Sequence, residues 1–327
     1  MERSDITALI SAECPRFPPA DNLHTPYTSR GTVARRFVKA DVAEPMTIRR
    51  CISLIAITVV LTLTTIQFWI SIFIYHPTPL NRSDPRSWGL EGAVPMKVAY
   101  DDGTMITGWW QRPANKNAPV VVLVHGRSAN ISSRSPVMQH LVADGMGVLM
   151  FDYRGYGASS GRPSEHNIIQ DTLTAYHWLR ARGVDAQRIV VVGQSLGNGP
   201  AAALAAQQPV GGLLLVSPFT TLPDAMAERL PWLPVHLVPW TRNRFDVGAY
   251  LVRFRGPTVL ITSKDDGMVP LKNARRLQAD KPDVRWLDVS PLRHDGMLQA
   301  VAEDGRLGRA IRALLHRATP VSRSIKQ

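Results

Sequence analysis

The stretch Arg188-Ile-Val-Val-Val-Gly-Gln-Ser-Leu-Gly-Asn-Gly-Pro-Ala-Ala-Ala-Leu-Ala-Ala206 decides the fold. Its start is a short apolar, β-branched run that predicts a buried strand, and its alanine-rich end predicts a helix. Between them stands Gly-x-Ser-x-Gly, with Ser195 at the centre. This succession is typical of a nucleophile elbow, in which glycines allow a sharp turn and the serine Oγ is exposed at the start of the helix. The sequence therefore predicts Ser195 as a nucleophile, with an ordinary glycine-rich turn as the alternative.

An acid that can orient a catalytic base lies in the loop after a later strand. Residues 257–262, Pro-Thr-Val-Leu-Ile-Thr, predict a core strand, and Asp265 and Asp266 follow closely. Loops at the carboxyl ends of parallel strands lie along one edge of a sheet, so this acid is expected beside Ser195. We favour Asp266, in the run that ends at Pro270, and keep Asp265 as the alternative.

A histidine that can act as the base follows the last predicted strand. Residues 284–288, Val-Arg-Trp-Leu-Asp, predict that strand, and His294 lies in the loop behind it. It is the only histidine after Asp266 in such a loop, because His316 falls in the predicted terminal helix. His294 can there accept the Ser195 proton while the aspartate holds its tautomer. A surface or core histidine without a catalytic role is the alternative.

Two backbone N–H groups are expected to hold the oxyanion that forms during acyl transfer. Residues 119–124, Pro-Val-Val-Val-Leu-Val, predict a buried strand that runs into His125-Gly126-Arg127. The donors of such a site come from the residue after the nucleophile and from the loop after this strand. We therefore expect the main-chain N–H groups of Leu196 and Arg127 to form the oxyanion hole, and we interpret His125 as structural.

Further motifs accompany these residues in a fixed order. They are the strand pair Met96–Trp110, His125-Gly126, Phe151–Gly157, the elbow, Ser217–Thr220, Arg244–Asp246, Asp266–Pro270 and His294. In this order they resemble the α/β-hydrolase superfamily, most of all its membrane-anchored α/β-hydrolase-domain proteins, with the serine aminopeptidase-like hydrolases as near relatives. The chain departs from that pattern at Arg127, where relatives usually carry a small uncharged residue, and at Leu292-Arg293, where they usually have glycine.

The resemblance implies an α/β fold, the α/β-hydrolase fold, and the order of the predicted elements agrees with it. Strand-like runs alternate with helical ones, which indicates a mostly parallel sheet covered by helices on both faces. The cap between Ser217 and Pro257 is short. We expect five parts: a disordered cytoplasmic N-terminal segment (1–50), a transmembrane signal anchor (51–75), a linker (76–92), the catalytic domain (93–320) and a tail (321–327).

One long apolar segment precedes the expected domain. Residues 51–75 contain no charged side chain and are long enough to cross a bilayer as a tilted helix. A cleaved signal peptide would have a shorter apolar core, of about 7–15 residues, with a small-x-small site behind it. We therefore interpret the segment as one membrane-spanning signal anchor in contact with the lipid bilayer. Met46 would itself be a normal start for such an anchor, so Met1 and Met46 are alternative initiators.

Positive charge is concentrated on the N-terminal side of this segment. The close basic residues before it are Arg35, Arg36, Lys39, Arg49 and Arg50, and those after it are Arg82 and Arg86. The more positive flank stays in the cytoplasm. We therefore expect a single-pass protein of the cell membrane with a cytoplasmic N-terminus and the catalytic domain on the extracytoplasmic side, which in a bacterium is the periplasm. Both cysteines, Cys14 and Cys51, lie outside that domain, so it needs no disulfide.

The formal net charge of +12 falls mostly on the expected catalytic domain and its flanks. Such a balance favours anionic partners, for example phospholipid headgroups. Zinc-finger spacing, RNA-binding aromatic motifs and recognition-helix patterns are all missing from the sequence, so nucleic acid is not expected as a partner. The sequence also has no H-E-x-x-H, no paired C-x-x-C, no P-loop and no dinucleotide fingerprint, so we expect no metal and no cofactor.

Three functions fit the expected site. The first is a serine hydrolase that cleaves small-molecule carboxylic esters or thioesters through an acyl-enzyme on Ser195. The second is a serine peptidase of the aminopeptidase or oligopeptidase kind with the same triad, and the third is a non-catalytic binding protein on a hydrolase fold. A peptidase that trims amino termini should carry an acidic group for the substrate ammonium and a larger cap. A binding protein should lack a triad residue, so we favour the ester hydrolase.

Overall fold

The computed structural model of the chain describes residues 47–79, 84–229, 231–232 and 243–318. The predicted disordered segment lies outside these residues except for 47–50, and the predicted tail, 321–327, lies wholly outside them. The predicted short cap is described in part, by the helix α5 (Leu222–Arg229) and the residues on either side of the gap at 233–242.

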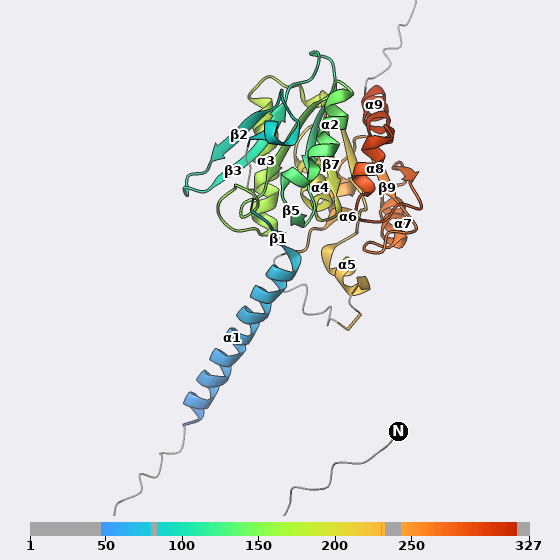
Figure 1. The fold of residues 1–327 in the computed structure, drawn as a ribbon. Helices are drawn as coiled ribbons and strands as arrows, with labels where there is room; N and C mark the ends of the chain where they lie inside the picture. The colour runs from blue at the N-terminus through green and yellow to red at the C-terminus, as the bar shows by residue number, and fades with distance from the viewer. Residues whose placement is uncertain (1–46, 80–83, 230, 233–242, 319–327) are drawn as a thin grey trace, which may run out of the picture. The chain divides into compact units, whose positions relative to one another are not determined.

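The centre of the domain is an eight-stranded sheet with the strand order β10-β9-β8-β7-β4-β6-β3-β2. The strands are β2 (Val94–Ala99), β3 (Met105–Gln111), β4 (Val120–Val124), β6 (Gly147–Asp152), β7 (Ile189–Gln194), β8 (Gly212–Val216), β9 (Thr258–Thr262) and β10 (Arg285–Asp288). From β6 to β10 all neighbours are parallel, whereas β3 runs antiparallel to both β6 and β2. In Figure 1, β2 and β3 lie towards one edge of the sheet and β9 towards the other.

The central strands are apolar along their whole length because both of their faces are covered. Every residue of β4, β7, β8 and β9 is buried, as expected for parallel strands between two helical layers. Register follows from this pairing: Val124 of β4 lies opposite Gly193 of β7, and Gln194 lies opposite Val216 of β8. The carboxyl ends of three strands therefore meet beside the predicted elbow.

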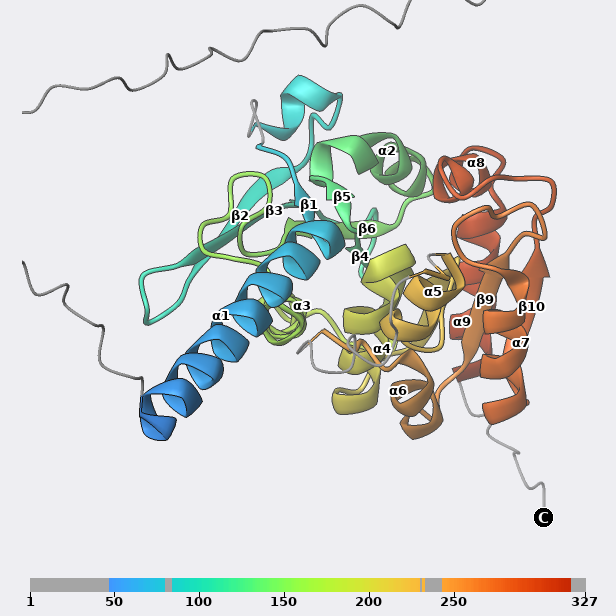
Figure 2. The same cartoon turned by 90° about the horizontal axis from the view of Figure 1, so that it is seen from below.

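Helices cover the two faces of the sheet. One layer contains α3 (Glu165–Arg180), α4 (Asn198–Gln207), α6 (Val247–Arg253) and α7 (Leu271–Asp280). The other contains α2 (Ser135–Ala143), α8 (Met297–Glu303) and α9 (Arg306–Ala318). Figure 2 shows α2 and α8 on one side of the strands and α3, α4 and α6 on the other. The expected mostly parallel sheet with helices on both faces is confirmed.

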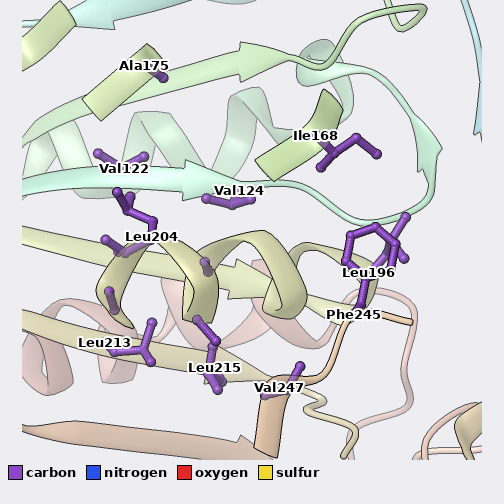
Figure 3. Close-up of a cluster of buried hydrophobic side chains, with 14 of the residues drawn as sticks. Val122, Val124, Ile168, Ala175, Leu196, Leu204, Leu213, Leu215, Phe245 and Val247 are labelled. Carbon is purple, nitrogen blue, oxygen red and sulfur yellow. The ribbon is translucent and has the colours of Figure 1, made fainter. Parts of the chain in front are cut away.

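Close packing of α4 holds the turn after β7 against the sheet. Small residues fill this helix, and a Cβ on Gly199 would lie only 2.4 Å from the Phe245 ring. Figure 3 shows the surrounding side chains, which come from β4, β8, α3, α4 and α6 and from the turns that carry Leu196 and Phe245. Leu204 is fully buried among them, so its replacement by alanine would destabilise the domain by about 2–5 kcal/mol.

The predicted membrane span is a helix, α1 (Ile48–Ile74), of 27 residues. In the described part of the chain it is the one helix long and apolar enough to cross a membrane, by length and composition alone. The qualifying window, Ile48–Thr65, has none of its residues buried.

The predicted linker, 76–92, contains packed elements. β1 (His76–Pro77) pairs in parallel with β5 (Ser128–Ala129), and His76 N–H donates to the Arg127 carbonyl at 3.0 Å. A 3₁₀ turn, η1 (Pro85–Trp88), follows, with the Asp84 side chain accepting from Arg86 N–H at its start. The start of this segment is therefore hydrogen-bonded to the loop that follows β4.

Candidate active site

Ser195 occupies a strained turn between β7 and α4. It begins the short 3₁₀ turn η4 (Ser195–Gly197) and has a φ of 52°, in the left-handed region that non-glycine residues rarely adopt. The turn is possible because backbone atoms of neighbouring residues lie where its glycines would carry a Cβ. A Cβ on Gly197 would lie 2.3 Å from the Val124 carbonyl oxygen, and one on Gly193 would lie 2.7 Å from the Gly197 carbonyl oxygen. Such strain in an ordered turn is typical of functional sites.

The structure brings Ser195, His294 and Asp266 together from three loops at one edge of the sheet. Ser195 follows β7, Asp266 follows β9, and His294 lies between β10 and α8. His294 Nε2 is 3.1 Å from Ser195 Oγ, and His294 Nδ1 is 3.0 Å from each carboxylate oxygen of Asp266. A carboxylate can only accept, so Nδ1 carries the hydrogen and Nε2 is left to accept the serine proton.

Asp266, and not its neighbour, faces the histidine. Its side chain is 2% exposed, and its Oδ1 also accepts the backbone N–H groups of Met268 and Val269, each at 2.9 Å. Burial on its own would raise the Asp266 pKa, but the hydrogen bond and charge of His294 and the Val269 N–H bring that pKa below its ordinary value. The carboxyl is therefore ionised. Asp265 is exposed, and its N–H donates to Ser263 Oγ at 3.1 Å.

The two expected oxyanion donors flank Ser195. Leu196 is its successor in η4, and Arg127 lies in the loop between β4 and β5; both line the same cavity as Ser195. A Cβ on Gly126 would lie 3.5 Å from Ser195 Cβ, so the peptide before Arg127 passes close to the serine. The Arg127 carbonyl accepts hydrogen bonds from His76 N–H at 3.0 Å and from Tyr156 Oη at 2.7 Å.

His125 holds the peptide that carries the Arg127 N–H. Its Nδ1 is 2.8 Å from the Gly126 carbonyl oxygen, which can only accept, so Nδ1 carries the hydrogen. Burial lowers the pKa of His125 to about 3, and the ring is neutral, stacked on Tyr153 with 4.0 Å between centroids. In a planar trans peptide the N–H points opposite to the carbonyl. The bond to Gly126 therefore sets the direction of the Arg127 N–H.

The cavity beside Ser195 has a volume of about 690 Å³. Part of its wall is apolar and comes from the loop after β8, from α5, from the loop after β9 and from the end of α1: Ile74, Phe219, Leu222, Ala225, Met226, Met268 and Val269. The charged residues of the lining, apart from His294, are Arg127, Arg134, Arg229 and Asp295. An apolar pocket with a few charged groups suits a small amphiphilic ligand.

Ile74 and Arg134 are among the wall residues that the sequence did not predict. Ile74 is 3% exposed and reaches the cavity from the end of α1, but an isoleucine in a long apolar run carries no signal of its own. Arg134 follows β5 in a polar loop whose conformation its sequence does not define. As for metals, the described residues contain no group of three or more His, Cys, Asp or Glu side chains that could hold an ion.

Comparison with known proteins agrees with this architecture. A family model described as alpha/beta hydrolase fold matches residues 119–247. An uncharacterized protein of Mycobacterium tuberculosis is 33% identical over 196 residues, which are 59% of this chain and 69% of that protein. The lysophosphatidylserine lipase ABHD12 of Danio rerio is 25% identical over 262 residues, 72% of this chain and 68% of the lipase.

Among solved structures, an esterase of Pyrococcus furiosus has the same fold. It superimposes with a TM-score of 0.59 at 22% sequence identity and covers 74% of this chain and 98% of the esterase. The chain belongs to the α/β-hydrolase superfamily. It is a hydrolase of that superfamily, with the α/β-hydrolase fold preceded by one apolar helix in its described residues.

Proposed function

We propose that the protein is a membrane-anchored serine hydrolase that cleaves carboxylic esters or thioesters through an acyl-enzyme on Ser195. The observation that carries the proposal is the continuous hydrogen-bonded path from Ser195 Oγ through His294 to Asp266, which ends at an open cavity. The domain boundaries expected from the sequence, with catalytic residues between 93 and 320, belong to the same proposal.

In the first half-reaction His294 Nε2 takes the Ser195 proton as Oγ attacks the carbonyl carbon of the substrate. The carbonyl oxygen becomes an oxyanion and accepts from the N–H groups of Leu196 and Arg127. The tetrahedral intermediate then collapses, and His294 gives its proton to the departing alcohol or thiol. The acyl group stays on Ser195 Oγ, while Asp266 stabilises the imidazolium during both transfers.

In the second half-reaction water repeats the sequence. His294 removes one proton from the water molecule, and the resulting hydroxyl attacks the acyl carbon. When the intermediate collapses, the proton returns to Ser195 Oγ and the carboxylic acid leaves. The two half-reactions balance in atoms and charge with only the chain, the substrate and one water molecule.

The composition of the cavity favours an ester over a peptide with a free amino terminus. A substrate ammonium would meet three arginines, and among the described residues of the lining the one carboxylate besides the relay is Asp295, which is exposed. The positive charges of these arginines would repel the ammonium group. The esterase of P. furiosus and the lipase of D. rerio act on esters by their names. A non-catalytic binding protein would not need the complete relay.

We further propose that α1 anchors the domain in the cell membrane, with the N-terminus in the cytoplasm and the domain on the extracytoplasmic side. The exposed apolar surface of Ile48–Thr65 supports the anchor. The basic residues before it, including Arg49 and Arg50, support the orientation.

The test uses the purified full-length chain in a neutral detergent. We expect hydrolysis of p-nitrophenyl esters of graded chain length, little hydrolysis of aminoacyl anilides, and covalent labelling by a fluorophosphonate probe. Ser195→Ala should lose both turnover and labelling while its circular dichroism spectrum stays unchanged, because the smaller side chain removes only Oγ. Labelling that persists in Ser195→Ala would place the nucleophile elsewhere, and preferential cleavage of the anilides would favour the peptidase.

A further inference from the structure

Among the described residues, a basic side chain lines the cavity beside Ser195 without an acidic partner at contact distance. Arg134 ends the 3₁₀ turn η2 (Ile131–Arg134), just before α2. Its Nε is fully buried and has no hydrogen-bond partner in the described part of the chain. Its Nη1 contacts the Ser133 carbonyl and hydroxyl oxygens, both at 3.4 Å. The 3.4 Å contacts of Nη1 are long, so Nη1 and Nη2 can still donate to a ligand in the cavity.

The surroundings of Arg134 make this position unfavourable in the empty cavity. Burial lowers the pKa of the Arg134 guanidinium, while the charge of Asp295 and the hydroxyl of Tyr153 raise it. Asp295 acts through its field only, since Arg134 forms no ion pair within the described ranges. A buried, unpaired cation is unfavourable unless an anion compensates it. Arg127 and Arg229, the latter at the end of α5, add further positive charge to the lining.

We propose that Arg134 is the anion-binding residue of this cavity, and that the substrate ester carries a phosphate or carboxylate group that pairs with its guanidinium. The inference rests on the proposed ester hydrolysis and specifies its substrate class. A guanidinium fork matches both oxyanions with two parallel N–H···O bonds. The apolar wall of Phe219, Leu222 and Met226 is suited to an alkyl chain. The substrate is therefore an anionic amphiphile, with its charged group on the acyl side or on the leaving-group side of the ester bond.

The test compares matched neutral and anionic esters with the full-length chain in a neutral detergent. One pair places the charge on the acyl side: p-nitrophenyl hexanoate and the mono-p-nitrophenyl ester of adipic acid. The other places it on the leaving group: monohexanoylglycerol and its phosphate monoester. A charge-assisted pair at the site should raise kcat/KM for the anionic member of at least one pair by about tenfold or more.

Variants of Arg134 separate anion binding from a structural role. In Arg134→Gln the ratio of the two kcat/KM values should fall by about tenfold, because the charge is lost while a polar, although shorter, side chain remains. Arg134→Lys should keep part of the ratio, since it restores the charge without the fork. Arg275→Gln removes an exposed arginine of α7 that does not line the cavity, so its ratio should equal that of the wild type.

A measurement on the unaltered protein does not depend on the folding of any variant. Inorganic phosphate should inhibit hydrolysis of p-nitrophenyl hexanoate competitively, and sodium chloride at the same ionic strength should not. Equal effects of the two salts, no charge preference in either ester pair, or an unchanged ratio in Arg134→Gln would each overturn the anion site while ester hydrolysis itself stands. Failure to hydrolyse any ester would overturn the proposed function first.

Discussion

Replacing His125 by phenylalanine tests whether this histidine orients the oxyanion hole without taking part in proton transfer. Phenylalanine keeps an aromatic ring stacked on Tyr153, where the His125 centroid lies 4.0 Å away. It removes the hydrogen bond from Nδ1 to the Gly126 carbonyl and also the buried Nε2, which has no hydrogen-bond partner in the described part of the chain. The Gly126–Arg127 peptide then loses the hydrogen bond that fixes its orientation.

The size of the effect follows from what still holds the loop. Removing one oxyanion donor altogether lowers kcat by about 100- to 1,000-fold. In His125→Phe the Arg127 N–H remains, and the next carbonyl is still held by His76 N–H and Tyr156 Oη. We therefore expect kcat to fall by about tenfold, with KM nearly unchanged, because the oxyanion forms only in the transition state. The lost buried hydrogen bond should lower the free energy of unfolding by about 1 kcal/mol.

The assay is steady-state hydrolysis of a p-nitrophenyl ester, with chemical denaturation of the same preparation as the stability measurement. Tyr156→Phe is the matched control. It removes a hydrogen bond to the Arg127 carbonyl, which belongs to the following peptide and not to the one that carries the Arg127 N–H. This control should keep most of its kcat. If His125→Phe retains wild-type kcat, or loses no more than Tyr156→Phe, the Arg127 N–H is not the donor that His125 orients.

Three further predictions follow from the site and the apolar helix. Asp266→Asn should lower kcat by about 10,000-fold, because an amide neither stabilises the imidazolium nor enforces its tautomer, while Asp265→Asn should change it little; the reverse result would move the acid by one position. Burial raises the pKa of Asp152 to about 7. Between about pH 4 and 7 the native state therefore keeps a proton that the unfolded chain has lost, and the free energy of unfolding falls as pH rises through that range. Asp152→Asn should flatten this part of a plot of the free energy of unfolding against pH, and an unaltered plot would contradict the prediction. A reporter active only after export, fused to Gln327, should give signal and a cytoplasm-specific reporter should not; the opposite pair of results would reverse the proposed topology.

The arrangement of the sheet could be predicted because its strands carry unambiguous local signals. β4, β7, β8 and β9 are short, wholly apolar runs, and such runs separated by helical segments define a parallel, doubly covered sheet. The convergence of the three predicted catalytic residues follows from the parallel arrangement of the strands. Ser195, Asp266 and His294 are far apart in sequence, but each follows a parallel strand, so all three lie at one edge of the sheet.

The remaining parts of the site depend on contacts that sequence periodicity does not encode. The role of His125 becomes visible only through its bond to the Gly126 carbonyl, and the unpaired guanidinium of Arg134 only through the folding of η2 beside the cavity. Both residues lie in irregular segments, where hydrogen bonds to distant backbone set the conformation. The charge of the cavity lining is likewise a tertiary property, since Arg134 and Arg229 approach it from different elements.

The end of α1 makes contacts with the catalytic domain that its apolar sequence does not predict. Ile74 lines the cavity, and the next residue, Tyr75, donates its hydroxyl to Asn243 Oδ1 at 2.7 Å. The same oxygen accepts the N–H of Glu165 at the start of α3, at 3.0 Å. One residue further, His76 N–H holds the Arg127 carbonyl behind the oxyanion loop.

Three consecutive residues therefore connect the apolar helix to the cavity wall, to the chain that returns from the cap, and to the oxyanion loop. A flexible tether would need none of these contacts. Under the proposed topology, the chain passes at Ile74 from the membrane span directly into the wall of the active-site cavity. The apolar residues of that lining suit an alkyl chain, and Arg134 in the same lining suits the charged group of the proposed substrate.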